Sequence, residues 1–349
     1  MKKIIAILLA VMLVASFSVS AFAAGSNDDA IKAVEAQLVK SAEAIFKDAD
    51  FNYENAGDFL LYIRSGADYS SKWDAFDQSV KGAFDNNTAL SLYQFSNILL
   101  CYIESGEDDE TALSLINKLT SYEPTFASAY EARSIFEAAA YADDDAFLEK
   151  LQNAFVPLFV EGQGYDYWGY SCDNNAAYAA ALGMLPINGN EAFDKYEIAD
   201  KVFELIENYK LDDGYAYLTQ YGASADSTAY VLMAKSIFDR ADTTEAYNLL
   251  QAFANDDGTY NFGGAPSAYS TKNAIIGLEY YLDYLYLTNV DDSEDTSQDV
   301  GTGDTPEVVA SKATTTPSTG DNLGVILSIA SLAVISAAGA AVVKTKKED

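Results

Sequence analysis

The hydrophobic and polar positions follow a helical period through most of the chain, from about residue 26 to residue 290. One kind of segment is amphipathic: in residues 193–209 the apolar side chains fall on one side and the charges on the other. Another kind, typified by residues 227–238, is apolar around most of its circumference and carries a single lysine. No run of residues shows a convincing strand alternation. Because a helix that is apolar all round must be covered on every side, the pattern predicts inner helices surrounded by outer ones.

The two kinds of segment alternate six times along the chain. Inner helices are expected near residues 56–65, 88–104, 124–141, 174–185, 227–238 and 268–286, and outer helices near 29–47, 71–83, 110–120, 144–157, 193–209 and 243–254. A repeat of about 45–50 residues is typical of stacked helix pairs. An open solenoid would leave the inner helices on an exposed concave face and needs polar end caps. We therefore predict an all-α fold, a six-by-two α/α toroid in which six inner and six outer helices close into a ring over residues 26–290.

A block of four features recurs in the second half of the chain: a glycine turn, a group of aromatic residues, a polar cap and an apolar helix. It reads QGYDYWGYSCDNNAAYAAALGML at 163–185, DDGYAYLTQYGASADSTAYVLMA at 212–234 and DDGTYNFGGAPSAYSTKNAIIGL at 256–278. Asp173, Ser227 and Ser270 stand where helix caps are expected. In a toroid these loops share one rim, so we predict a ligand-binding site formed by the aromatic residues Tyr165, Tyr167, Trp168, Tyr170, Tyr215, Tyr217, Tyr221, Tyr260 and Phe262.

This block resembles the repeats of the terpenoid-cyclase and protein-prenyltransferase toroid superfamily. Residues 57–66, GDFLLYIRSG, resemble the first inner helix of its bacterial exported members. The resemblance covers about residues 27–288 and implies a six-by-two α/α barrel. The chemistries that the superfamily uses lack their motifs here: no histidine is present for the prenyltransferase zinc set, no inner helix carries the cyclase Asp-X-Asp-Asp motif, and the thioester sequence Cys-Gly-Glu-Gln is absent.

Residue content narrows the possible chemistry further. With two cysteines and no histidine, the chain contains neither a Ser-His-Asp nor a Cys-His catalytic set. In the predicted ring Cys101 and Cys172 lie at opposite rims, roughly 20 Å apart by helix rise, so we predict two unpaired thiols. Residues 255–258 with Asn261 offer oxygen ligands but lack the spacing of an EF-hand loop. We predict no metal and no cofactor.

Four aspartates on the aromatic rim keep an enzymatic alternative open. Glycoside hydrolases and polysaccharide lyases use the same barrel, and hydrolases need two carboxylates at a set spacing. Aromatic faces beside carboxylates are typical of sugar sites. The competing interpretation of each aspartate is a helix cap or a turn residue. The candidate catalytic residues are Asp173, Asp226, Asp166 and Asp213.

Both ends of the chain carry targeting patterns. Residues 1–23 have two lysines, a short apolar core at 4–14 and Ala21-Phe22-Ala23, which predicts a signal peptide cleaved after Ala23; a retained membrane anchor is the alternative. Residues 291–315 are rich in Asp, Ser, Thr and Gly and predict a disordered spacer.

The sequence TPSTGD at 316–321, an uncharged stretch at 323–343 and a lysine-rich tail resemble the wall-sorting signal of Gram-positive surface proteins. The match to the usual Leu-Pro-X-Thr-Gly pentapeptide holds at Pro317, Thr319 and Gly320 and departs at Thr316. The resemblance implies that a sortase cuts after Thr319 and joins this residue to peptidoglycan. A plain single-pass anchor is the alternative, since 21 uncharged residues can span about 30 Å of hydrocarbon. Both interpretations place residues 24–315 outside the cell.

The charge balance bears on the ligand. The chain has 21 Lys and Arg against 53 Asp and Glu, a formal net charge of −32, which disfavours nucleic acid and anionic lipid as partners. We predict a surface-anchored binding module for a neutral or cationic ligand, a glycan or a small amphipathic molecule. The alternatives are a glycan-cleaving enzyme and a ligand-free adhesin or spacer.

Overall fold

The computed structural model describes residues 28–142, 144–185 and 193–294, and these ranges are predominantly helical. The predicted signal peptide, the sorting signal with Thr319, and the spacer beyond residue 294 lie outside them. Within the described residues, no helix is both long enough and apolar enough to cross a membrane.

Six helices occupy the positions predicted for the inner set. They are α3 (Ala56–Arg64), α5 (Leu92–Ser105), α7 (Ala129–Ala139), α9 (Cys172–Met184), α11 (Ala225–Ile237) and α13 (Ala268–Glu294). In α9 every residue except Asp173 is buried, as an apolar circumference requires. The last helix continues to Glu294, so residues 291–294, predicted as the start of the spacer, are helical. This prediction was wrong because no glycine or proline interrupts residues 278–294.

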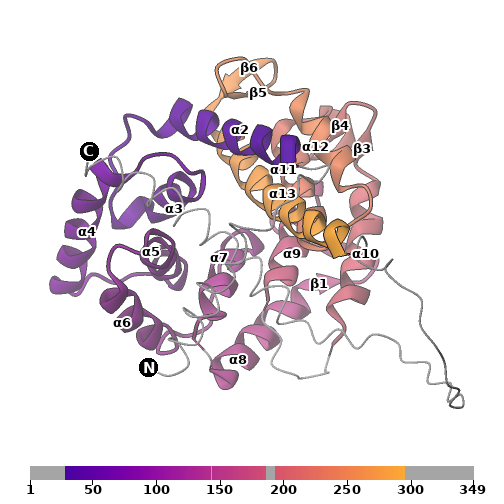
Figure 1. Cartoon of the computed structure of the whole chain (residues 1–349). Coiled ribbons are helices and arrows are strands. Elements are labelled where there is room, and N and C mark those ends of the chain that lie inside the picture. Colours follow the sequence, from indigo (N-terminus) through magenta and orange to yellow (C-terminus); the bar gives the residue numbers. More distant parts are fainter. Residues whose placement is uncertain (1–27, 143, 186–192, 295–349) are drawn as a thin grey trace, which may run out of the picture.

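Six helices match the predicted outer set. They are α2 (Asp28–Phe46), α4 (Ser70–Asp85), α6 (Asp109–Leu119), α8 (Asp145–Phe155), α10 (Lys195–Glu207) and α12 (Thr243–Gln251). Each buries one face; in α10 the buried positions include Ala199, Val202, Phe203 and Ile206. In Figure 1, α4, α6 and α8 lie on the outer side of α3, α5 and α7. Short 3-10 helices add η1 (Tyr53–Asn55), η2 (Val156–Leu158) and η3 (Thr219–Tyr221).

Each inner helix contacts the next one along the chain, from α3 through to α13, and α13 also contacts α3 and α2. Two polar contacts accompany this approach of distant segments. Lys272 on α13 binds Asp58 on α3 at 2.6 Å, and the Tyr286 hydroxyl on α13 donates to Glu35 on α2 at 2.6 Å. The last described helix therefore packs against the first ones.

Three short antiparallel hairpins precede the last three inner helices. They are β1 (Phe159–Val160) with β2 (Gly164–Tyr165), β3 (Lys210–Leu211) with β4 (Gly214–Tyr215), and β5 (Tyr260–Phe262) with β6 (Ala265–Ser267). The hydropathy pattern did not predict them, because strands of two or three residues are too short to show an alternation.

The helix caps lie earlier than predicted. Ser171 caps α9 and Ser224 caps α11, each accepting a hydrogen bond from the backbone N–H three residues on. Asp173 and Ser227 therefore lie in the first turns, where their side chains are free for contacts with other helices. Ser270 is likewise inside α13, and its N–H donates to the Ser267 hydroxyl.

Candidate functional site

The same hydrogen bond fixes each Gly-Tyr hairpin to the helix that follows it. In each case the tyrosine N–H donates to a side-chain oxygen in the first turns of the helix. The three bonds are Tyr165 to Asn175 Oδ1 at 3.0 Å, Tyr215 to Thr228 Oγ1 at 3.0 Å and Tyr260 to Thr271 Oγ1 at 2.9 Å. The recurring block of the sequence is thus a structural repeat.

The glycine in this block is required by close approach. Gly164 has φ +103°, and a Cβ added there would lie 2.3 Å from Asn175 Oδ1. Gly214 has φ +147°, and its added Cβ would lie 2.9 Å from Thr228 Oγ1. A side chain at either position would displace the residue that accepts the tyrosine N–H bond.

Three of the nine predicted ligand-binding aromatics lie in the core: Tyr165, Tyr215 and Tyr260 are each 4% exposed or less. The Tyr165 hydroxyl accepts from the Ala129 N–H at 3.0 Å, which ties the first hairpin to α7. The Tyr215 hydroxyl accepts from Lys235 Nζ at 2.8 Å. These hydroxyls are engaged in holding the fold.

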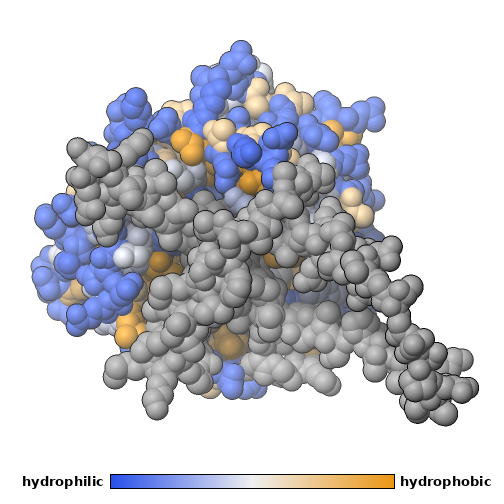
Figure 2. Space-filling model, viewed as in Figure 1, coloured by the Kyte–Doolittle hydropathy of each residue, from blue (hydrophilic) through white to orange (hydrophobic). Residues whose placement is uncertain are grey.

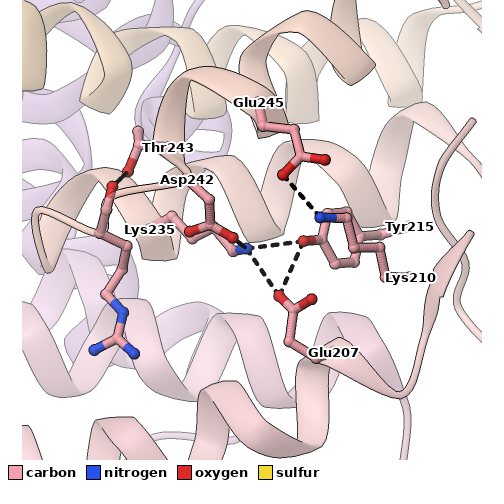
Figure 3. A network of polar contacts seen from close by, with 8 residues as sticks. Glu207, Lys210, Tyr215, Lys235, Asp242, Thr243 and Glu245 are labelled. Atoms are coloured by element: carbon pink, nitrogen blue, oxygen red, sulfur yellow. Dashed lines mark hydrogen bonds and ion pairs between the residues drawn. The ribbon is translucent and has the colours of Figure 1, made fainter. Parts of the chain in front are cut away.

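Lys235 is the centre of the polar network around Tyr215 (Figure 3). Its ammonium group is almost fully buried and contacts Glu207 Oε1 at 2.8 Å, the Tyr215 hydroxyl and Asp242 Oδ2. The pKa of Asp242 is lowered, because the bond and charge of Lys235 outweigh its partial burial. The network joins α10, β4 and the C-terminal part of α11 to the start of α12.

The other six predicted aromatics lie in the segments that lead into the inner helices, with Tyr221 in η3 and Phe262 in β5. Tyr167 is half-buried, with its ring 5.3 Å from that of Trp168 and 6.0 Å from that of Tyr130. Trp168 is 91% exposed and has φ +58°. The remaining exposed residues are Tyr170, Tyr217, Tyr221 and Phe262. Their binding role stays a prediction.

A cavity of about 200 Å³ lies between the N-terminal halves of the inner helices, and all six contribute to its lining. Its walls combine tyrosines with apolar and polar side chains. They include Leu60 and Leu61 of α3, Tyr93 and Asn97 of α5, Tyr130 and Arg133 of α7, Ala177 of α9, Tyr230 and Met233 of α11, and Tyr269, Lys272 and Asn273 of α13. The cavity is the point at which helices from the whole described chain converge.

None of the nine predicted aromatics lines this cavity; its tyrosines are Tyr93, Tyr130, Tyr230 and Tyr269. The prediction from the sequence did not include these four tyrosines, because it was based on the aromatic residues that precede the inner helices. A usable signal was present, since Tyr130 and Tyr230 each follow a small hydroxyl residue and an alanine in the first turns of an apolar helix. Tyr167 connects the two sets, because its ring contacts that of Tyr130.

Two of the four tyrosine hydroxyls of the cavity are held by amide side chains. Tyr130 donates to Asn174 Oδ1 at 2.8 Å, and Tyr230 donates to Asn273 Oδ1 at 3.2 Å. The two rings are in edge contact, with centroids 5.2 Å apart. Burial raises the pKa of both hydroxyls well above the usual value, so they stay protonated at neutral pH.

Two of the four candidate catalytic aspartates come together beside the cavity, although neither lines it. Asp226 accepts from Asn273 Nδ2 at 2.8 Å and from the Ser270 hydroxyl at 3.1 Å. Burial raises the pKa of Asp226. Burial also raises the pKa of Asp173 to about 6, and the nearby charge of Asp226 acts in the same direction, against a hydrogen bond from Ser227. The Asp173 Oδ1 atom is buried without a hydrogen-bond partner.

The other two candidates have local roles. Asp166 is exposed and accepts from the Gly169 N–H at 2.8 Å within its own loop. Asp213 is exposed between β3 and β4. Neither approaches the cavity lining, which agrees with the turn interpretation.

The floor of the cavity is polar and rests on a buried group of charges. Arg133 Nη1 donates to the Tyr280 hydroxyl at 2.8 Å and to Glu137 Oε1 at 3.2 Å. Below it, Arg64 bridges Glu137 at 3.1 Å and Glu104 at 3.0 Å, with all three side chains almost fully buried. The helical pattern did not reveal this group, because it is assembled from four inner helices that contribute only one or two charges each.

Two further acids complete this buried group, Glu279 and Asp283 on α13. Neither carboxyl oxygen of either residue has a hydrogen-bond partner. Burial raises the pKa of Glu279 to about 8, although Arg64 and Arg133 oppose the shift. Burial raises the pKa of Asp283 well above its usual value. The buried group contains four acids and two arginines. Protonation of Glu279 and Asp283 removes the excess negative charge that this composition would otherwise carry.

In the described part of the chain no group of three or more His, Cys, Asp or Glu side chains has the arrangement of a metal site. The side-chain oxygens of the 255–261 turn accept hydrogen bonds from within the turn: Asn255 Nδ2 donates to Asn261 Oδ1, and the Thr259 N–H donates to Asp257 Oδ1. Cys101 and Cys172 are buried as free thiols.

A scan against protein-family models finds no match for this chain, and a search of the curated proteins finds none either.

Proposed function

We propose that this chain is a surface-anchored binding module that holds a small neutral, hydroxyl-rich ligand, a sugar, in the central cavity. One observation carries the proposal: side chains of all six inner helices converge on a cavity of about 200 Å³ that contains four tyrosines. A concave site with aromatic faces and a few placed polar groups is typical of ligand binding. Aromatic rings offer the apolar faces of a sugar ring a surface, while amide and carboxylate groups bind its hydroxyls.

The charges of the lining favour a neutral ligand. Lys272 is paired with Asp58 at the mouth, and Arg133 is paired with Glu137 at the floor. The chain as a whole carries −32 charges, which repels a polyanion. In Figure 2 the described surface visible at the edge of the molecule is mostly hydrophilic, in keeping with this charge.

The proposal includes closure of the helices into a six-by-two toroid related to the terpenoid-cyclase and prenyltransferase superfamily. Support comes from the contacts of α13 with α3 and α2, which bring the last helix to the first. It also includes export through residues 1–23 and covalent attachment at Thr319 by a sortase to the peptidoglycan of a Gram-positive cell. Attachment would hold the cavity outside the cell, where free and wall-bound glycans are the available hydroxyl-rich ligands.

Glycan cleavage is a second candidate, favoured by one observation. Burial raises the pKa of Asp173 to about 6, and Asp226, which is bound to Asn273 of the cavity lining, is close enough for its charge to raise that pKa further. A carboxyl group with a pKa near the working pH suits a general acid, and a second carboxylate suits a base or nucleophile. Reducing-sugar release that is lost in Asp173→Asn and Asp226→Asn, with folding retained, would support it over simple binding.

The binding proposal is tested with the purified chain on a glycan array and by calorimetry. Tyr230→Ala is expected to weaken binding at least tenfold, because it removes an aromatic wall of the cavity. Tyr196→Ala, on the exposed side of α10, is the matched control and should leave affinity unchanged. Trp168→Ala and Tyr217→Ala show whether the loop aromatics take part. Absence of binding to any glycan would favour the ligand-free spacer, and equal affinity in Tyr230→Ala would place the site elsewhere.

A further inference from the structure

We infer that the site recognises the end of an oligosaccharide, with the terminal sugar in the central cavity and the next sugar in an adjoining groove. The inference rests on the proposed function. It adds to that function the number of sugars bound and which part of the oligosaccharide enters the cavity. It comes from the relation between two hollows of the molecule.

The second hollow, which we call the η1 groove, has a volume of about 190 Å³. It lies at the N-terminal ends of α3 and α5, against η1. Four residues line both the cavity and the η1 groove: Gly57, Asp58, Tyr93 and Asn97. Because the two hollows share these residues, they are adjacent, and we place the second sugar of the ligand in the η1 groove.

Gly57 stands at the junction of the two hollows. A Cβ added there would lie 3.3 Å from the Tyr93 hydroxyl and 3.5 Å from Asn97 Nδ2. The Tyr93 and Asn97 side chains therefore pack closely against Gly57, and a side chain at this position would crowd both of them. A larger residue would extend from the helix into the shared wall.

The size of the cavity limits how much ligand it holds. A water molecule occupies about 30 Å³ of liquid, so a 200 Å³ space takes on the order of six waters, which is comparable to one sugar ring. Its floor is closed by Arg133, whose guanidinium group is bound to Tyr280 and Glu137. A chain therefore enters by its end, since an internal sugar would need a second exit through the floor.

The η1 groove has the side chains that a second sugar needs. Tyr53 provides an aromatic face, and Glu54 and Gln94 provide polar atoms. Capping boxes hold two of its walls in place: Asn55 Oδ1 accepts from the Asn52 N–H, and Gln94 Oε1 accepts from the Ser91 N–H. These groups are ordered before a ligand arrives, which lowers the entropic cost of binding.

The opposite side of the mouth is occupied by the loop before α9. Asn174 Nδ2 donates to the Tyr167 and Gly169 carbonyls at 2.9 and 2.6 Å, which holds this loop over the N-terminus of α9. Tyr167 packs its ring against Tyr130 of the cavity wall. The second sugar is thus directed toward α3 and α5, and not toward α9.

The test measures affinity against ligand length by calorimetry with the full chain. The probes are glucose, galactose, mannose and N-acetylglucosamine, the linear di- and trisaccharides of each, and a cyclic glucose oligosaccharide that has no end. We expect the disaccharide of the preferred sugar to bind about tenfold more tightly than the monosaccharide. The trisaccharide should add little, and the cyclic probe should not bind.

Variants separate the two subsites. Tyr53→Ala and Glu54→Ala, which touch only the η1 groove, should weaken disaccharide binding about fivefold to tenfold and leave monosaccharide binding within twofold. Tyr230→Ala, in the cavity alone, should weaken both. Circular dichroism of each variant confirms folding, and Glu54→Ala, at an exposed position, remains informative if Tyr53→Ala unfolds.

The outcomes distinguish this inference from the proposed function. If monosaccharides bind through Tyr230 but disaccharides gain nothing, or the groove variants have no effect, the two-subsite inference is wrong and the binding function stands. Binding of the cyclic probe would likewise overturn recognition of a chain end. If no sugar of any length binds, the proposed function itself fails.

Discussion

At the scale of single residues, the least expected feature is the group of ionisable side chains beneath the cavity. Arg64, Glu104, Glu137, Glu279 and Asp283 are all buried. Burying a charge is costly unless it is paired. Of these five side chains, Arg64, Glu104 and Glu137 form ion pairs with described residues, and no ion pair is found for Glu279 or Asp283 within the described part of the chain. The remaining two acids meet the cost by staying protonated, which makes the stability of the fold depend on pH.

Glu279 gives this dependence a predicted direction. Its pKa is raised from 4.5 to about 8, so the folded state binds more protons than the unfolded state between these values. Stability therefore falls as pH rises from about 4.5 to 8, by roughly 1 kcal/mol per pH unit from this group. Glu279→Gln cannot ionise and is expected to flatten the decline and to be more stable than the parent at pH 8.

The measurement is denaturant unfolding from pH 5 to pH 9. Glu197→Gln, an exposed acid on α10, is the control and should keep the parental slope. An unchanged slope in Glu279→Gln would mean that Glu279 is ionised in the fold.

Lys235 provides a second prediction at this scale. Its ammonium group is 3% exposed and joins Glu207, Asp242 and the Tyr215 hydroxyl (Figure 3). Lys235→Met keeps an apolar stem but removes three polar contacts, while the two half-exposed acids regain water. We expect a loss of about 2 kcal/mol in the free energy of unfolding.

Lys201→Met is the matched control for this change. Lys201 bridges Glu161 and Glu197 on the surface, where ion pairs contribute less than about 1 kcal/mol. Equal losses in the two variants, measured by chemical denaturation, would contradict a structural role for the Lys235 network.

At the scale of elements, the twelve helices followed from the period of the apolar residues, and the three hairpins did not. Helical periodicity over ten or more residues is a strong local signal. A hairpin with strands of two or three residues has no such signal, and it is held by a tertiary bond from a tyrosine N–H to the next helix. The glycine and tyrosine of each block were visible in the sequence, while the receiving Asn175, Thr228 and Thr271 were not identified.

This repeated bond is testable in one block. Thr228→Val keeps the shape of the side chain but leaves the buried Tyr215 N–H without an acceptor. An unsatisfied buried donor costs about 1–3 kcal/mol, so we expect a loss of that size. Thr88→Val, at an exposed position between α4 and α5, should change stability by less than about 0.5 kcal/mol. Thermal and denaturant unfolding compare the two; equal stability would show that the hairpin is held by other contacts.

At the scale of the whole molecule, the approach of α13 to α2 and α3 matters most. The buried hydrophobic residues form one cluster that runs from Ile31 to Leu285. An open solenoid would keep most repeats folded after losing a terminal helix, because each repeat depends on its neighbours alone. A closed ring that loses its last inner helix loses the contacts of that helix with the neighbours on both of its sides.

Truncation distinguishes these architectures. Deletion of residues 268–349 is expected to abolish cooperative unfolding and to reduce helicity well beyond the share of α13, because it exposes α11, α2 and α3 together. Deletion of residues 295–349 leaves the cluster intact and should leave the unfolding transition unchanged. Calorimetry measures the unfolding transition of each truncated chain, and circular dichroism measures its helicity. A cooperative transition in the chain that lacks residues 268–349 would refute closure of the ring.

The positions of the helices, and which of them are covered, could be predicted from the chain alone, because helical period and apolar circumference depend on residues close together in the chain. The Gly-Tyr blocks could be identified in the same way, since each is a local pattern. Which tyrosines face a cavity and which acids are buried without partners became clear from the folded arrangement alone. Those properties arise where helices more than 200 residues apart in the chain meet, and no local pattern records such a meeting.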